Sequence, residues 1–167
     1  MVFQMSLESF DPSYTLGASI AEVARSFGAT RAEAKSLALE KLQLVGLDES
    51  FYYRFPSQVS GGQCQRAALA RALTADPSVL ICDEITSALD VSTQVHIASL
   101  IEELKGKVSI VFITHDIALV SELADRLLVL DGGKVVECGT TENVVANPQS
   151  TCAKKLMSSA YSLGGLG

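Results

Sequence analysis

The phosphate-binding loop G-x-x-x-x-G-K-[ST] is absent from this sequence. Its two Gly-Lys pairs, Gly106-Lys107 and Gly133-Lys134, are each followed by valine, and the first glycine of the pattern is replaced by Ile101 and by Leu128. The loop needs its glycines and its terminal Ser or Thr to surround a phosphate with backbone N–H groups. Neither pair can therefore form it.

Other absences narrow the class of protein. No apolar run approaches the roughly 18–20 residues of a membrane-spanning helix, and the start, Met1–Met5, has no basic region ahead of an apolar core, so it predicts no signal peptide. The net charge is −6 and no long basic run occurs, which argues against general nucleic-acid binding. We therefore expect a soluble, cytoplasmic protein that reaches a membrane only through a partner.

The cysteines also lack a metal-binding or disulfide pattern. They are scattered without C-x-x-C spacing, at Cys64, Cys82, Cys138 and Cys152. Reduced thiols in a cytosolic protein account for them better than a metal site or a disulfide framework.

What the chain does have is enough apolar residues for a core. It contains 167 residues, of which 48% are hydrophobic, which fits one domain or most of a larger one. A helix is predicted to begin at Thr30 and to end at Gly46. Thr30 and Glu33 are predicted to form a capping box at its start. Its inward face is predicted to carry Ala34, Ala38, Leu42 and Val45.

Strands and helices alternate through the rest of the chain, an order typical of an α/β fold with a parallel sheet. Residues 1–4 are predicted to end a strand, residues 5–19 to be turn-rich, and Tyr52–Gln58 to be a loop. The helix from Ser92 is predicted to turn Val95, Ala98, Ile101 and Leu104 inward. The remaining predicted elements are a helix from Ser60 to before Pro77, strands Val79–Cys82 and Val108–Ile113, a helix from Asp116 to about Ala124, a hairpin of Leu127–Leu130 with Lys134–Glu137, and helices Thr141–Ala146 and Ser150–Ala160.

The first candidate site is the turn that opens the helix at Ser60. Two glycines follow it, so a ligand can approach the backbone closely where free N–H groups and the helix dipole favour an anion. Taken alone, such a turn is more often an ordinary helix cap. The residues concerned are Ser60, Gly61, Gly62 and Gln63.

The second candidate site is Asp83-Glu84, directly after the apolar strand Val79–Cys82. Carboxylates just past the carboxyl end of a parallel strand lie where such sheets bind ligands. Asp83 suits a contact with Mg²⁺ made through water or through another ligand of the ion, and Glu84 suits a general base that orients an attacking water. Two acids that merely cap a turn are the alternative.

These motifs together resemble the ABC-type ATPase domain. Val59–Gln63 is similar to the signature L-S-G-G-Q, with Val59 for Leu, and it is followed by Ala70-Arg71-Ala72-Leu73; Cys64 stands where the family has a long polar residue. Asp83–Asp90 is similar to D-E-P-T-S-A-L-D, with Ile85 for Pro. The order of the motifs carries the resemblance, which covers nearly the whole chain.

The resemblance implies roles for further residues. His115, in Thr114-His115-Asp116, matches the switch histidine that contacts the γ-phosphate, although a lone histidine after a strand is more often structural. Gln4 matches the Q-loop glutamine, which reaches Mg²⁺ and the attacking water, and Asp90 lies in the segment called the D-loop. The segment Val136–Gly139 is most similar to ATPase subunits of peptide or nickel importers.

The expected fold is therefore an incomplete ABC ATPase domain: an α/β, P-loop NTPase-like parallel sheet with flanking helices and a small helical subdomain. We expect the end of a strand with the Q-loop Gln in 1–4, the helical subdomain in 5–76, the α/β core in 77–147, and a C-terminal helix and tail in 148–167. A truncated chain would explain the missing phosphate loop; a deliberately half-equipped subunit is the less favoured explanation.

The expected function is that of an ATP-hydrolysing subunit of an ABC transporter, with ATP and Mg²⁺ as cofactors, for import of peptides or a related small solute. The resemblance implies two partners, a second ABC ATPase domain and transmembrane permease subunits that hold the protein at the inner face of the membrane. The alternatives are a non-transport ABC ATPase and a catalytically inactive ABC-like interaction module. Without the phosphate loop, the chain alone is expected to be inactive.

Overall fold

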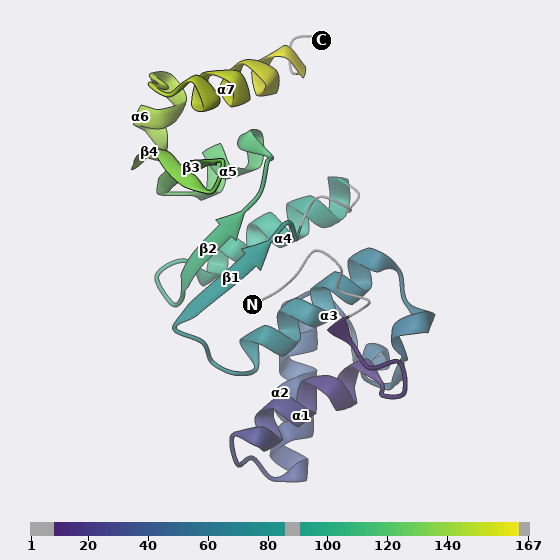
Figure 1. Ribbon diagram of the computed structural model, residues 1–167. Coiled ribbons are helices and arrows are strands. Elements are labelled where there is room, and N and C mark those ends of the chain that lie inside the picture. Colours follow the sequence, from purple (N-terminus) through teal and green to yellow (C-terminus); the bar gives the residue numbers. More distant parts are fainter. Residues whose placement is uncertain (1–8, 86–90, 164–167) are drawn as a thin grey trace. The chain divides into compact units, whose positions relative to one another are not determined.

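The computed structural model describes residues 9–85 and 91–163, except for the side chains of residues 91–93 and 160–163. The chain divides into two compact units, Met1–Ile113 and Thr114–Gly167 (Figure 1).

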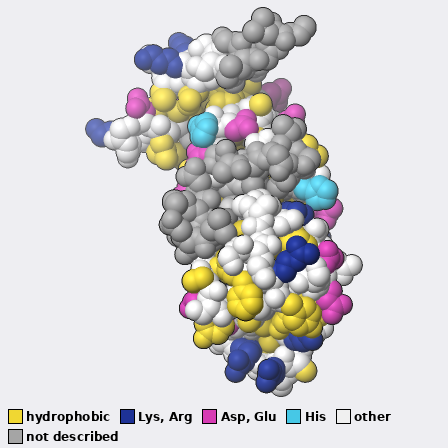
Figure 2. Space-filling model, turned by 90° about the vertical axis from the view of Figure 1, so that its right-hand side faces the viewer, with side chains coloured by type: hydrophobic (Ala, Val, Ile, Leu, Met, Phe, Trp, Pro, Cys, Tyr) yellow, Lys and Arg dark blue, Asp and Glu magenta, His cyan; other side chains and the backbone are white. Residues whose placement is uncertain are grey.

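Three helices pack together at the start of the first unit: α1 (Leu16–Ser26), α2 (Arg31–Leu44) and α3 (Gly61–Leu73). Two short 3₁₀ helices, Glu49–Tyr53 and Pro56–Gln58, fill the connection between α2 and α3, where the sequence predicted a loop. Figure 2 shows basic, acidic and hydrophobic side chains interspersed over this helical part.

The turn-rich prediction for residues 5–19 is wrong from Leu16 onward, because α1 begins there. Thr15 caps the helix by accepting a hydrogen bond from the Ala18 N–H at 3.2 Å. Leu16, Ile20 and Ala24 are buried at a spacing of four residues, so the helical periodicity was present in the sequence.

The prediction for α2 is confirmed. Thr30 Oγ1 accepts from the Glu33 N–H at 3.3 Å, and Glu33 Oε2 accepts from the Thr30 N–H at 2.8 Å, which completes the capping box. Gly46 has a φ of 70°, in the left-handed region where glycine carries no Cβ penalty. The four residues predicted to face inward, Ala34, Ala38, Leu42 and Val45, are all buried.

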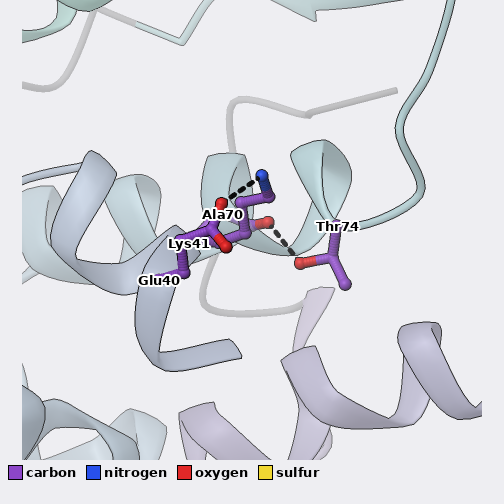
Figure 3. Close-up of polar contacts among 4 residues, drawn as sticks. All are labelled: Glu40, Lys41, Ala70 and Thr74. Atoms are coloured by element: carbon purple, nitrogen blue, oxygen red, sulfur yellow. Dashed lines mark hydrogen bonds and ion pairs between the residues drawn. The ribbon is translucent and has the colours of Figure 1, made fainter. Parts of the chain in front are cut away.

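The far end of α3 is closed by Thr74. Its side chain is buried, and its hydroxyl donates to the Ala70 carbonyl at 2.9 Å (Figure 3). The same view shows Lys41 paired with Glu40 at 2.9 Å on α2. Glu40 is exposed, so this ion pair adds little stability.

A parallel strand pair follows the helices. β1 (Val79–Asp83) pairs with β2 (Ser109–Ile113) from Val79 opposite Ser109 to Asp83 opposite Ile113, and α4 (Val91–Leu104) connects the strands. The predicted strands and their parallel direction are confirmed, but Val108 lies outside β2. In the part of the chain that the structure describes, this sheet has two strands.

The inward face predicted for α4 is partly wrong, because Val95 is 59% exposed. Ile97, Ile101 and Leu104 recur on one side of the helix, and Val95 lies roughly opposite them at about 100° per residue. The buried residues of α4 are Ile97, Leu100, Ile101 and Leu104. Of the four residues predicted to face inward, Ile101 and Leu104 are buried, Ala98 is half-buried and Val95 is exposed.

The second unit contains α5 (Ile117–Leu123), the antiparallel strands β3 (Arg126–Asp131) and β4 (Lys134–Thr140), and the helices α6 (Thr141–Ala146) and α7 (Thr151–Leu163). Gly132 and Gly133 turn the hairpin with φ values of 55° and 76°, as the Asp-Gly-Gly sequence predicted. Val129, Val144, Ala153 and Met157 form its core.

Glu137 connects β4 to the start of α7. Its carboxylate accepts from the Gln149 N–H at 2.9 Å and from the Ser150 N–H at 2.8 Å. These backbone hydrogen bonds, first that from Gln149, lower the pKa of Glu137 below its usual value. Ser150 in turn accepts from the Ala153 N–H, so the carboxylate positions the residue that caps α7.

We predict that Glu137→Gln lowers the melting temperature of the chain, because an amide accepts these two hydrogen bonds less strongly than a carboxylate. Since the folded pKa of Glu137 is lowered, its stabilisation is present above the unfolded pKa of about 4.3 and is lost as pH falls through the folded value. Thermal melts from neutral pH to about pH 3 measure both effects. The control is Glu122→Gln, which makes the same charge change at an exposed residue of α5. Equal melting temperatures for the two variants would contradict the prediction.

Candidate functional site

The start of α3 is organised by Ser60 and Gln63. Ser60 Oγ accepts from the Gln63 N–H at 3.3 Å, and Gln63 Oε1 accepts from the Ser60 N–H at 3.0 Å. Both side chains thus complete a second capping box. The N–H groups of Gly61 and Gly62 precede the first intrahelical donors, so they are available to an anion at the positive end of the helix dipole.

Gly61 is not required by the fold of this chain. A Cβ placed at Gly61 meets nothing within 4 Å, and its φ is not positive. Glycine in place of alanine weakens a helix by up to about 1 kcal/mol, least at its ends. Packing within the chain therefore gives no reason for glycine at this position.

Gly17 in α1 gives the opposite result. A Cβ there would lie 2.2 Å from Tyr52 Cδ2 and 2.6 Å from the Tyr52 carbonyl oxygen. Glycine at this position is therefore a packing requirement inside the helical part.

Three residues after the Ser60 turn hold α3 in its place within the helical part. Arg66 Nη1 donates to the Gly46 carbonyl at 2.9 Å and to the Val45 carbonyl at 3.3 Å, so it closes the end of α2. Arg71 Nη1 donates to the Ser9 carbonyl at 2.7 Å, and its guanidinium lies 4.2 Å from the centre of the Phe10 ring. Cys64 is fully buried, which explains an apolar side chain there.

Asp83 and Glu84 lie at the carboxyl end of β1, as predicted. The Glu84 N–H donates to the Ile113 carbonyl at 2.8 Å and so continues the strand ladder by one bond. Glu84 has a φ of 51°, a left-handed conformation that costs a side-chain-bearing residue about 1–2 kcal/mol. Its Oε2 atom is shielded from solvent. A strained residue with a shielded carboxylate oxygen at a strand end marks a candidate functional position.

Two other side chains near Glu84 are buried. Cys82 lies in β1, and loss of hydration raises the pKa of its thiol to about 12, so it stays protonated and unreactive at neutral pH. Ile85, which departs from the proline of the resembling motif, is also buried. The substitution therefore supplies an apolar anchor directly after Glu84.

His115 lies in the second unit, between β2 and α5. Asp116 caps α5 by accepting from the Leu119 N–H at 3.1 Å, as the sequence predicted. The Asp116 N–H donates to Thr114 Oγ1 at 3.0 Å, and His115 between them is exposed. The role of His115 beside Glu84 stays a prediction, because the two residues belong to different units.

Gln4 and Asp90 lie outside the described residues, and their proposed roles also stay predictions. Asp83 offers the carboxylate oxygen that Mg²⁺ prefers, and one or two such ligands suffice when phosphates supply the others. Within residues 9–85 and 91–163, no group of three or more His, Cys, Asp or Glu side chains is arranged to hold a metal ion by itself. The same part of the chain contains no helix long and apolar enough to cross a membrane.

Comparison with known proteins gives consistent relatives. The family model for ABC transporters matches residues 1–87. The chain is 41% identical over 162 residues to the oligopeptide transport ATP-binding protein OppF of Escherichia coli, covering 95% of this chain and 48% of that protein. It is 43% identical over 155 residues to the dipeptide transport ATP-binding protein DppD of Lactococcus lactis, covering 89% of this chain and 44% of that protein.

A third relative is the glutathione import ATP-binding protein GsiA of Escherichia coli, 41% identical over 171 residues, with 99% of this chain and 27% of that protein covered. Among solved structures, a dimeric ATP-binding cassette in a post-hydrolysis state with ADP and Pi matches with a TM-score of 0.75 and 30% identity, over 84% of this chain and 62% of that one. The chain thus spans about half the length, or less, of the curated relatives it matches.

We predict that Gly61→Ala leaves stability unchanged or raises it by less than about 1 kcal/mol, because the added methyl group enters open space. Gly17→Ala should lower stability by about 1–3 kcal/mol or more, because the methyl group must displace Tyr52. Urea unfolding of the two variants measures the difference. A Gly61→Ala variant as unstable as Gly17→Ala would show that Gly61 has a packing role.

Proposed function

Because the chain belongs to the ABC transporter family, we propose that it is part of an ATP-hydrolysing subunit that powers import of peptides or a related small solute. The observation that carries the proposal is the pairing, within one unit, of a capped glycine turn at α3 with a carboxylate pair at the end of β1. The glycine turn is suited to binding a phosphate, and the carboxylate pair is suited to activating water.

The two sites serve different steps. Glu84 is proposed as the general base that orients the attacking water, with Asp83 and Gln4 holding Mg²⁺, which supplies charge neutralisation at the phosphates. The Ser60 hydroxyl and the Gly61 and Gly62 N–H groups stabilise phosphate charge across a dimer interface.

The remaining candidates support these roles. His115 steadies the γ-phosphate, and Asp90 and Gln63 position groups at the same interface. Gln63 is suited to this indirect role, because its side-chain oxygen holds the Ser60 N–H.

The proposed partner is a second ABC ATPase domain, since the structural relative is described as dimeric. Permease subunits at the inner face of the membrane are the second proposed partner, and a cytoplasmic, peripheral location follows from them. Peptides are favoured as substrates because the relatives are named for oligopeptide, dipeptide and glutathione transport. The same names favour transport over the alternative of a non-transport ABC ATPase.

We predict that this chain alone releases negligible phosphate from Mg²⁺-ATP, because its sequence contains no G-x-x-x-x-G-K-[ST] loop to hold the β- and γ-phosphates. Phosphate release by the purified chain, with and without ATP, measures this. Turnover that Glu84→Gln abolishes would contradict the prediction and show that the chain forms a complete site.

We also predict that joining the chain to a segment that contains the phosphate loop produces ATP hydrolysis, and that Glu84→Gln lowers its rate about 10²–10⁴-fold, the range typical for loss of a general base. ATP binding should persist, since the amide keeps the shape of the carboxylate. Glu103→Gln, an exposed acid on α4, is the matched control. Equal rates for the two variants would reject Glu84 as the base, and hydrolysis by neither variant nor parent would favour the inactive interaction module.

A further inference from the structure

A small hollow, which we call the α1 hollow, lies on the surface of the helical part. Its volume is about 380 Å³, within the range of roughly 300–1,000 Å³ that is usual for pockets that hold small molecules. Four of its residues follow one another at a spacing of three or four along α1, so they share one face of that helix. The residues that line the hollow are Ala18, Ala21, Glu22, Arg25, Arg31 and Tyr52.

The Tyr52 ring is a wall of the α1 hollow that is held in place by its neighbours. It lies against Gly17, where an added Cβ would be only 2.2 Å from Tyr52 Cδ2. It meets the Tyr53 ring edge to face, with the ring centres 5.1 Å apart, and Lys35 Nζ lies 5.6 Å from its centre. The two alanines of the lining are too small to fill the space beside it. The hollow is therefore formed before a ligand binds.

Charged side chains of both signs line the α1 hollow. Glu22, Arg25 and Arg31 are all exposed. In the described part of the chain, residues 9–85 and 91–163, no ion pair involves any of the three. Glu22 precedes Arg25 by three residues, which is about 4.5 Å along the axis of α1. A ligand in the hollow therefore meets a negative and a positive charge a short distance apart.

We propose that the α1 hollow binds a small zwitterion of the amino-acid type, either a single amino acid or a dipeptide. Arg25 and Arg31 hold its carboxylate, because guanidinium groups match a carboxylate with paired hydrogen bonds. Glu22 holds its ammonium group, and the apolar part of the ligand lies on the Tyr52 ring. An extended dipeptide spans at most about 7 Å, which suits the short spacing of the charges. The hollow includes neither the Ser60 turn nor Glu84, so this site goes beyond the proposed function.

The proposal is tested by titrating the purified full chain with the dipeptide alanyl-phenylalanine and, separately, with phenylalanine. NMR should show saturable shifts of the backbone amides of residues 18–25 and of Tyr52. The stronger of the two ligands identifies the length that the hollow accepts. N-acetyl-alanyl-phenylalanine lacks the ammonium group and alanyl-phenylalanine amide lacks the carboxylate, so each should bind about tenfold or more weakly than the dipeptide. Because binding is measured without ATP, the result is independent of the proposed activity.

Two variants assign the two ends of the ligand. Glu22→Gln and Arg31→Gln should each weaken binding of the dipeptide about tenfold. Glu22→Gln should have little effect on the N-acetylated dipeptide, and Arg31→Gln should have little effect on the amidated one, because each of these ligands already lacks the matching charge. The controls are Glu103→Gln and Lys134→Gln, which make the same charge changes at exposed residues outside the hollow. Circular dichroism verifies that each variant is folded.

Three results would overturn the proposal. The first is no binding of either alanyl-phenylalanine or phenylalanine by the folded chain. The second is equal binding of the dipeptide and its two capped forms, which would show that the charges do not select the ligand. The third is binding of inorganic phosphate as tight as that of the dipeptide and unchanged by Glu22→Gln, which would identify the α1 hollow as a general anion site.

Discussion

The parallel ladder between β1 and β2 is the interaction on which the candidate catalytic residues depend. It places Asp83 opposite Ile113 and continues through the Glu84 N–H, which bonds to the Ile113 carbonyl. Glu84, which donates this last bond, has a positive φ. The strain is tolerated because the ladder before it and the buried Ile85 after it leave the chain little alternative. The carboxylate is thereby positioned by the backbone and not by its own side-chain contacts alone.

The glycine turn at α3 shows how one short motif divides between structure and chemistry. Ser60 and Gln63 use their side chains to cap the helix, while Arg66, Arg71 and the buried Cys64 attach the helix to its own unit. Gly61 has no structural task that the described contacts explain. A substitution at Gly61 can therefore test ligand contact without changing the stability of the helix. Ser60→Ala would change both, since loss of a helix cap costs about 0.5–2 kcal/mol by itself.

The sheet of the first unit leaves apolar side chains exposed to solvent. Val111 and Ile113 of β2 are 49% and 44% exposed, whereas Leu80 and Cys82 of β1 are buried. Within residues 9–85 and 91–163, β2 pairs with β1 alone. A two-stranded sheet is marginally stable by itself in water. The ladder that places Glu84 therefore depends on burial of the face that carries Leu80 and Cys82.

The sequence by itself determined the features that depend on near neighbours. The capping box at Thr30, the start of a helix at Ser60 and the Asp-Gly-Gly hairpin follow from residues within four positions of one another, and all three were predicted correctly. The tertiary structure decided the rest. Val95 was misplaced because the spacing of apolar residues alone does not show which side of α4 is buried. The Glu84 N–H, for its part, bonds to a residue 29 positions away (113 minus 84). Gly17 and Gly61 differ in the same way. The Tyr52 ring packs against Gly17, whereas an added Cβ at Gly61 would meet nothing within 4 Å. The contact between Gly17 and Tyr52 forms only when the chain folds, because the two residues are far apart in the sequence.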